Sequence, residues 1–227
     1  MAERVEVEYD EARWLTLRRI RSEAMNLMRP LADNHVDSLA YGSVARGDVD
    51  ERSDVDVFVP RPPAPAILEA LIERAGIPVA YREIVQATPT YAPKGYIYVE
   101  ERRGYSFPLV DLRTVELEFY GFAGSVKIDQ MKAEARVPGV DKRLMLIEPT
   151  ERGHVESTIA GREGEVAKTL GIEVATVLDR VRTLRRRERF GRTGVYLKRP
   201  LAPGEGFCDV YRDLAMHRPP LRRRLRM

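Results

Sequence analysis

The sequence has few of the residues on which several classes of protein depend. A single cysteine, Cys208, excludes an intrachain disulfide framework and a cysteine-based zinc site. The three histidines, His35, His154 and His217, lie far apart and show no metal-ligand spacing. No apolar run approaches the roughly 20 residues of a membrane-spanning helix, and the N-terminus lacks the apolar stretch of a signal peptide. These absences predict a cytoplasmic protein.

Charge is unevenly distributed along the 227 residues. From Thr150 to Met227 there are 18 Lys and Arg against 10 Asp and Glu, a net of +8, whereas the preceding residues carry 20 against 25, a net of −5. Such asymmetry predicts a catalytic part joined to a part that contacts a polyanion. Pro149 offers a natural boundary, so we expect one domain at residues 1–149 and a smaller one at residues 150–227.

The stretch from Tyr41 to Val59 carries the strongest functional pattern. It reads as a short apolar strand, a Gly-Ser turn, a polar loop and a second apolar strand. Because side chains alternate along a strand, Asp54 and Asp56 are expected on one face, roughly 7 Å apart at Cα, with Val55 facing the core. Two carboxylates at that spacing can hold Mg²⁺, which prefers oxygen ligands.

Three residues upstream of these carboxylates suit a phosphate group. Gly42 allows close approach of the backbone, Ser43 offers a hydroxyl and an N–H, and Arg46 can donate two hydrogen bonds to phosphate. The alternative is an exposed acidic turn, since Asp and Ser are common turn residues. The Gly-Ser-x-x-Arg-Gly pattern upstream favours a phosphate-binding turn that faces a metal site.

The motif Gly-Ser-x-x-Arg-Gly at 42–47, followed by Ser-Asp-x-Asp at 53–56, resembles the signature of the nucleotidyltransferase superfamily that includes DNA polymerase beta. The likeness is to archaeal-type members of that superfamily. It implies an α/β (α+β) fold, in which helices cover one face of a mixed sheet, and a third carboxylate on a later strand. It also implies two Mg²⁺ ions, with Mn²⁺ as an alternative, and transfer of a nucleoside monophosphate from a nucleoside triphosphate (NTP) to an acceptor.

The third carboxylate has three candidates. Asp111 lies near the end of Tyr105–Leu112, which reads as a strand, and has apolar neighbours on both sides. Glu116 and Glu118 qualify by the same alternation, or else belong to a solvated strand face. Alternation alone leaves all three open.

A second resemblance favours Asp111. Val-Asp-Leu-Arg at 110–113, followed by Phe-Ala-Gly-Ser at 122–125, resembles the polymerase beta type. There an Asp on such a strand is the third metal ligand, and a Phe-x-Gly-Ser segment lies near the incoming sugar and base. The resemblance therefore implies metal binding by Asp111 and nucleotide contact by Phe122 and Gly124.

Apolar periodicity predicts the remaining elements of the N-terminal part. A stripe over Tyr9–Leu31 indicates an amphipathic helix that covers the sheet. Later segments indicate a short helix over 66–75, a strand over 77–85, and a hairpin over 96–99 and 105–112. This order fits the mixed sheet that the resemblance implies.

The C-terminal part resembles a winged helix-turn-helix domain. Glu163–Leu170 and Glu173–Arg187 read as two helices, and Phe190–Leu197 reads as two short strands around a Gly-containing turn. Such domains bind nucleic acid, but also serve as dimerisation modules or lids, so a homodimer is an alternative. The basic side chains placed to neutralise phosphates are Arg180, Arg182, Arg185, Arg186, Arg187, Arg192 and Lys198.

The sequence thus predicts a metal-dependent nucleotidyltransferase. Asp54, Asp56 and Asp111 would hold two Mg²⁺, while Ser43 and Arg46 would bind the β and γ phosphates of the NTP. The basic C-terminal part favours a nucleic-acid acceptor, with a small alcohol or a protein hydroxyl as alternatives. A DNA-binding regulator that senses a nucleotide without turning it over is a further alternative.

Overall fold

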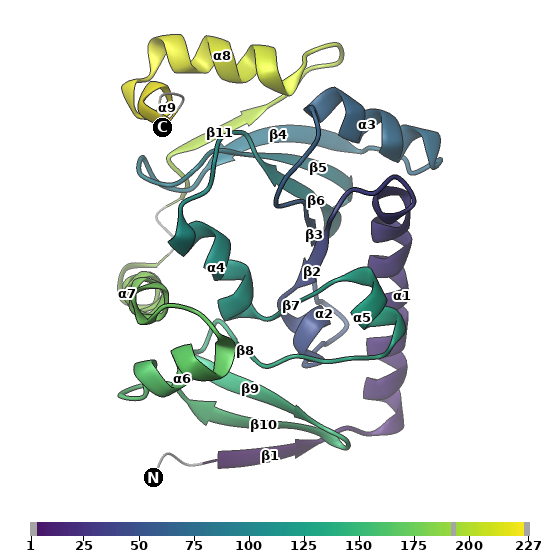
Figure 1. The fold of residues 1–227 in the computed structure, drawn as a ribbon, viewed down its shortest axis with the longest axis vertical. Coiled ribbons are helices and arrows are strands. Elements are labelled where there is room, and N and C mark those ends of the chain that lie inside the picture. The colour runs from purple at the N-terminus through teal and green to yellow at the C-terminus, as the bar shows by residue number, and fades with distance from the viewer. Residues whose placement is uncertain (1–3, 192–193, 225–227) are drawn as a thin grey trace. The chain divides into compact units, whose positions relative to one another are not determined.

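Figure 1 shows a computed structural model of the chain, which describes residues 4–191 and 194–224. The expected α/β (α+β) fold class is confirmed. The chain divides into two units, and each unit is assembled from several separate segments of the sequence. Unit 1 comprises residues 1–25, 39–55 and 114–193, and unit 2 comprises residues 26–38, 56–113 and 194–227.

Helix α1 (Glu11–Ala32) confirms the amphipathic helix expected at Tyr9–Leu31. Leu17, Ile20 and Ala24 are buried along one side of it, at the spacing that a helix requires. Its residues up to Met25 belong to unit 1 and the remainder to unit 2. No helix in the described part of the chain is long and apolar enough to cross a membrane.

Unit 1 contains a four-stranded antiparallel sheet in the order β1-β10-β9-β8 (Figure 1). A second pairing in this unit joins β2 to β7, with Ala40 opposite Val126. These strands are β1 (Arg4–Glu8), β2 (Leu39–Tyr41), β7 (Ser125–Val126), β8 (Gly139–Val140), β9 (Met145–Thr150) and β10 (Gly153–Thr158).

Pro149 lies within β9 and pairs with His154 of β10. The domain boundary expected at this proline therefore falls inside a hairpin. Proline donates no ladder hydrogen bond, which is why it suggested a break, but the edge of a sheet or the end of a strand tolerates it. The change in charge near residue 150 does not mark the division between the two units.

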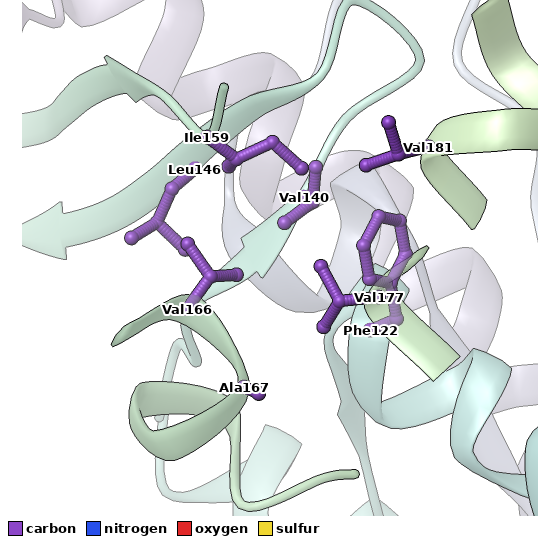
Figure 2. Close-up of a cluster of buried hydrophobic side chains, with 8 residues drawn as sticks. All are labelled: Phe122, Val140, Leu146, Ile159, Val166, Ala167, Val177 and Val181. Carbon is purple, nitrogen blue, oxygen red and sulfur yellow. The ribbon is translucent and has the colours of Figure 1, made fainter. Parts of the chain in front are cut away.

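A hydrophobic cluster packs the helices of unit 1 against its sheet (Figure 2). Helices α6 (Glu163–Leu170) and α7 (Val174–Phe190) confirm the helix pair expected in the C-terminal part. The pair packs on Phe122 of α4 (Thr114–Ala123) and on strand residues. The cluster comprises Phe122, Val140, Leu146, Ile159, Val166, Ala167, Val177 and Val181.

Unit 2 is built on strands in the order β11-β4-β5-β6-β3. Its buried face carries Ile97 and Phe107, and the Phe107 ring meets Phe207 of α8 edge-on at 5.0 Å. The Tyr105 hydroxyl donates a hydrogen bond to the carbonyl of Leu27. The elements are β3 (Val55–Phe58), α3 (Pro65–Arg74), β4 (Tyr81–Gln86), β5 (Lys94–Glu100), β6 (Arg103–Pro108), β11 (Leu197–Pro200), α8 (Phe207–His217) and α9 (Pro219–Arg224).

Two short strands were expected at Phe190–Leu197, and the described residues of that range have no strand before Leu197. β11 begins at Leu197 and pairs antiparallel with β4 of the unit 2 sheet, with Leu197 opposite Gln86. β11 is therefore the edge strand of a larger sheet. Arg192, expected on the wing, lies outside the described residues.

Candidate active site

Two glycines flank the short helix α2 (Ser43–Arg46), which follows β2 through a turn at Gly42. Gly42 has φ 78° and Gly47 has φ 101°, conformations that strain any residue with a Cβ atom. No atom lies within 4 Å of the position that a Cβ on Gly42 would take. The N–H of Gly42 donates to the carbonyl of Gly124 at 2.9 Å, which fixes the turn against the end of α4.

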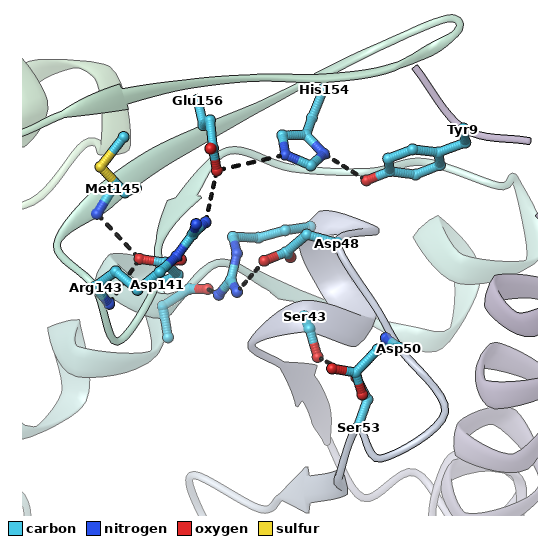
Figure 3. Close-up of polar contacts among 12 residues, drawn as sticks. Tyr9, Ser43, Asp48, Asp50, Ser53, Asp141, Arg143, Met145, His154 and Glu156 are labelled. Atoms are coloured by element: carbon cyan, nitrogen blue, oxygen red, sulfur yellow. Dashed lines mark hydrogen bonds and ion pairs between the residues drawn. The ribbon is translucent and has the colours of Figure 1, made fainter. Parts of the chain in front are cut away.

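The polar loop after this turn folds back onto it (Figure 3). Ser43 Oγ donates to Ser53 Oγ at 3.3 Å, and Ser53 Oγ accepts a hydrogen bond from the backbone N–H of Asp50 at 2.9 Å. The hydroxyl of the Gly-Ser turn therefore lies beside the residue that precedes Asp54. This contact joins the Gly-Ser turn to the first residue of the Ser-Asp-x-Asp motif.

Arg46 occupies a buried position that differs from the phosphate-binding role expected of it. Its side chain is 5% exposed and donates to the carbonyl of Ala123 at 2.7 Å and to Asp48 Oδ2 at 2.8 Å. The guanidinium thus ties α2 to the end of α4. Gly124 belongs to the same contact, because a Cβ there would lie 2.9 Å from Arg46 Cγ.

Phe122 also has a structural role. It is 2% exposed and belongs to the hydrophobic cluster of unit 1. A ring covered on its sides by Val177 and Val181 of α7 has no face for a nucleotide (Figure 2). The nucleotide contact expected of Phe122 is therefore not available in this arrangement.

The burial pattern around the two motif carboxylates follows the predicted alternation. Asp54 directly precedes β3 and is exposed, Asp56 within β3 is half-buried, and Val55 and Val57 are fully buried. The alternation keeps both carboxylates out of the core. Carboxylate oxygens are ligands that Mg²⁺ prefers. Asp54 belongs to unit 1 and Asp56 to unit 2, so the convergence of their oxygens stays a prediction.

The candidates for a third carboxylate lie outside strands. Asp111 is exposed in the segment after β6, whereas Glu116 and Glu118 lie in helix α4, so the strand expected there is wrong. Glu118 Oε2 accepts hydrogen bonds from the Glu173 N–H and the Thr176 hydroxyl, which ties α4 to α7. Within the described residues, no three His, Cys, Asp or Glu side chains are grouped to hold a metal ion.

Residues 29–110 match the family model described as "Nucleotidyltransferase domain". This segment resembles the nucleotidyltransferases. The match includes the Gly-Ser turn and both motif carboxylates and ends one residue before Asp111. It supports nucleotidyl transfer as the general activity. Searches of the curated proteins and of the solved structures found no match.

The nucleotidyltransferase segment contains a polar face that the sequence analysis missed. Along β5, Lys94, Tyr96 and Tyr98 are half-buried, while Gly95 and Ile97 between them are buried. The first three side chains therefore share one face of the sheet. The alternation of these side chains with Gly95 and Ile97 is visible in the sequence.

Asp56 acts electrostatically on two tyrosine hydroxyls of this polar face. Burial, with smaller contributions from the carboxylates of Asp56 and Glu83, raises the pKa of Tyr96 to about 12. Burial also raises the pKa of Tyr98, with the same two carboxylates contributing. The Tyr98 ring stacks on Tyr81 at 4.4 Å and on Tyr96 at 5.8 Å. Both hydroxyls are therefore protonated hydrogen-bond donors at neutral pH.

Lys198 belongs to this face rather than to a wing. Its ammonium lies 3.3 Å from Glu83 Oε2, and Glu83 is almost fully buried. This ion pair within unit 2 counts against the prediction that Lys198 binds nucleic acid. The pairing of β11 with β4 places it there.

The basic helix expected to contact nucleic acid is α7. Arg180 near its middle is half-buried, with its guanidinium 4.7 Å from the centre of the Phe119 ring. The other four predicted contacts are exposed: Arg182, Arg185, Arg186 and Arg187. Every residue from 185 to 190 is exposed, so the C-terminal turns of this helix present their charge to solvent.

Proposed function

We propose that the protein is a metal-dependent nucleotidyltransferase that moves a nucleoside monophosphate from an NTP to a hydroxyl acceptor. The contact between Ser43 and Ser53 carries the proposal, because it joins the Gly-Ser turn to the residue before Asp54. Both lie in the segment that matches the family model. A phosphate-binding turn beside paired carboxylates is the arrangement that phosphoryl chemistry needs.

Asp54 and Asp56 would hold the divalent ions, with Asp111 proposed as the third ligand. Mg²⁺, or Mn²⁺ in its place, would supply charge neutralisation of the triphosphate and would lower the pKa of the attacking hydroxyl. The exposed oxygens of Asp54 and the half-buried side chain of Asp56 fit a hard cation with room for phosphate oxygens.

The chain's own groups would orient the NTP. The open space beside Gly42 admits a phosphate close to the backbone, and the Ser43 hydroxyl can turn from Ser53 to donate to a phosphate oxygen. Arg46 would contribute indirectly to NTP binding, by holding the turn in place through its hydrogen bond to the carbonyl of Ala123. Tyr96, protonated at neutral pH, can donate a hydrogen bond on the face that carries Asp56.

A nucleic-acid acceptor is favoured by the exposed arginines at the end of α7. Arginine pairs with phosphate through a planar fork of N–H donors, and a row of them suits a phosphodiester backbone better than a small alcohol. Charge alone carries no base preference, so we propose contact with the backbone rather than sequence reading.

Transfer is tested with each NTP labelled at the α-phosphate, in the presence of Mg²⁺ and with DNA, RNA or protein as acceptor. The proposal predicts label on a nucleic-acid end. Label on protein or on a small alcohol would support nucleotidyl transfer but contradict a nucleic-acid acceptor. Saturable NTP binding with no transfer to any acceptor would instead favour a nucleotide-sensing regulator.

A further inference from the structure

Unit 1 contains a cavity of about 450 Å³ that the proposed reaction does not use. Residues of α1 line one side of it and the segment from Met131 to Arg136 lines another. Trp14 and three other side chains give it apolar walls. Its charged lining has four cations and two carboxylates, a net charge of +2: Arg18, Arg21, Lys132, Glu134, Arg136 and Glu151.

Two of these cations, one buried and one half-buried, have no acidic partner among the residues that the structure describes. Arg21 is 7% exposed, donates only to the carbonyls of Glu134 and Ala135, and leaves its Nε without a hydrogen bond. Arg136 donates to the carbonyls of Gly153 and Thr150. Neither guanidinium forms an ion pair with any carboxylate in the part of the chain that the structure describes.

The two guanidiniums also act on each other. Burial lowers the pKa of Arg21, and the charge of Arg136 lowers it further, against a smaller opposing effect of Glu134. Burial likewise lowers the pKa of Arg136. An arginine keeps its proton despite such shifts, so two positively charged guanidiniums line the same cavity. A bound anion would compensate them, whereas the protein supplies neutral acceptors, namely carbonyl oxygens and, for Arg136, the Tyr9 hydroxyl.

The geometry favours an anion that carries an organic group. The Arg136 guanidinium lies over the Trp14 ring, 4.9 Å from its centre, a cation–π contact that helps to hold it in place. The lining of the same cavity includes the apolar side chains of Trp14 and two methionines. Arg18 and Lys132 add exposed charges, so more donors converge than one carboxylate accepts.

We propose that this cavity binds a small phosphorylated molecule of roughly nucleotide size, at a site separate from the Gly-Ser turn and the motif carboxylates. Its volume lies in the range of about 300–1,000 Å³ that is usual for small-molecule sites. A phosphate group would meet the guanidiniums of Arg21 and Arg136, and its apolar portion would lie near Trp14. This site is independent of the proposed nucleotidyl transfer.

Trp14 allows a direct test, because it is the chain's single tryptophan. The full chain is titrated with AMP, pyrophosphate and citrate in EDTA, so that no divalent ion supports binding at the motif carboxylates. We expect a saturable change of tryptophan fluorescence with AMP and pyrophosphate, confirmed by calorimetry. Absence of saturable binding tighter than about 1 mM, or equal binding of citrate, would overturn the proposal.

Variants locate the binding. Arg18→Ala removes an exposed cation that forms no ion pair in the described structure, so the fold should persist while affinity falls about tenfold. Arg29→Ala, an exposed arginine of the same helix outside the cavity, is the matched control and should bind as the parent does. Asp54→Asn should also leave binding unchanged. Loss of binding in Asp54→Asn with retention in Arg18→Ala would place the ligand elsewhere and refute the site.

Discussion

At the scale of single residues, His154 shows how burial sets a charge state. Its side chain is 3% exposed and its Nδ1 lies 2.7 Å from the Tyr9 hydroxyl (Figure 3). Burial lowers the pKa of His154 below its ordinary value of 6.5, although the charges of Asp48 and Glu156 oppose the shift. The ring is therefore neutral at pH 7.

The lowered pKa predicts a loss of stability in mild acid. As the pH falls below 6.5, the unfolded chain binds a proton at His154 that the folded chain resists, so the free energy of unfolding falls. The stabilisation is present above that value and is lost as the pH falls toward the folded pKa. Thermal unfolding between about pH 5 and 7.5 measures it.

Two variants separate His154 from other titrating groups. His154→Gln should flatten the dependence of the melting temperature on pH, because the proton-binding difference is removed. His217→Gln, at an exposed position on α8, should leave that dependence unchanged. A slope that persists in His154→Gln would assign the acid sensitivity to another group.

Arg46 shows why some residue roles could not be predicted from the sequence. Its position in the motif suggested a phosphate ligand, but its partner is the carbonyl of Ala123, 77 residues away. Hydrogen bonds between distant segments leave no local pattern. By contrast, the alternation of Asp54, Val55, Asp56 and Val57 is set by strand geometry and was predicted correctly.

At the scale of elements, the short helix α2 depends on the conformation of the glycine that ends it. A Cβ on Gly47 would be strained at φ 101° and would lie 2.6 Å from Cδ of Arg136. Arg136 cannot move away freely, because its guanidinium is held over Trp14 and bonded to two carbonyls. We expect Gly47→Ala to lower the free energy of unfolding by about 1–3 kcal/mol.

Urea denaturation measures this change, and Gly164→Ala is the matched control. Gly164 lies in helix α6 with no atom within 4 Å of its Cβ position and no positive φ. Alanine there should be neutral or stabilise by up to about 1 kcal/mol. Equal effects of the two substitutions would contradict the account of the α2 turn.

The exposed end of α7 makes a second prediction at this scale. If it contacts phosphodiesters, duplex DNA should bind with an affinity that falls steeply as salt rises. Replacing Arg185 and Arg186 by Ala should weaken binding across sequences and reduce the salt slope by roughly two. Arg29→Ala serves as control, and the measurement is a mobility shift over a salt series. Binding that is insensitive to salt would argue against a nucleic-acid acceptor.

Two elements show the limits of periodicity. Apolar residues alternate through Val115, Leu117 and Phe119, which suggested a strand. The segment instead forms α4, whose buried residues include Glu116, Tyr120 and Ala123 at helical spacing, while Leu117 is exposed. β11 pairs with β4, more than 100 residues earlier, rather than with a neighbouring strand. Sequence patterns specify the period of an element but not a distant partner.

At the scale of the whole molecule, the two units interleave along the chain instead of following one another. The expected division at Pro149 assumed that a change in charge marks a change of unit. The nucleotidyltransferase match, residues 29–110, draws on both units. Local motifs therefore predicted the class of activity, whereas the arrangement of segments depended on contacts that composition does not encode.

The central claim is that the paired motif carboxylates support nucleotidyl transfer. The most direct measurement is pyrophosphate release from an NTP with Mg²⁺ by Asp54→Asn and Asp56→Asn, beside the exposed control Asp209→Asn. The account predicts a loss of at least about a hundredfold in each of the first two and nearly unchanged release in the control. Turnover that persists in both motif variants would contradict it.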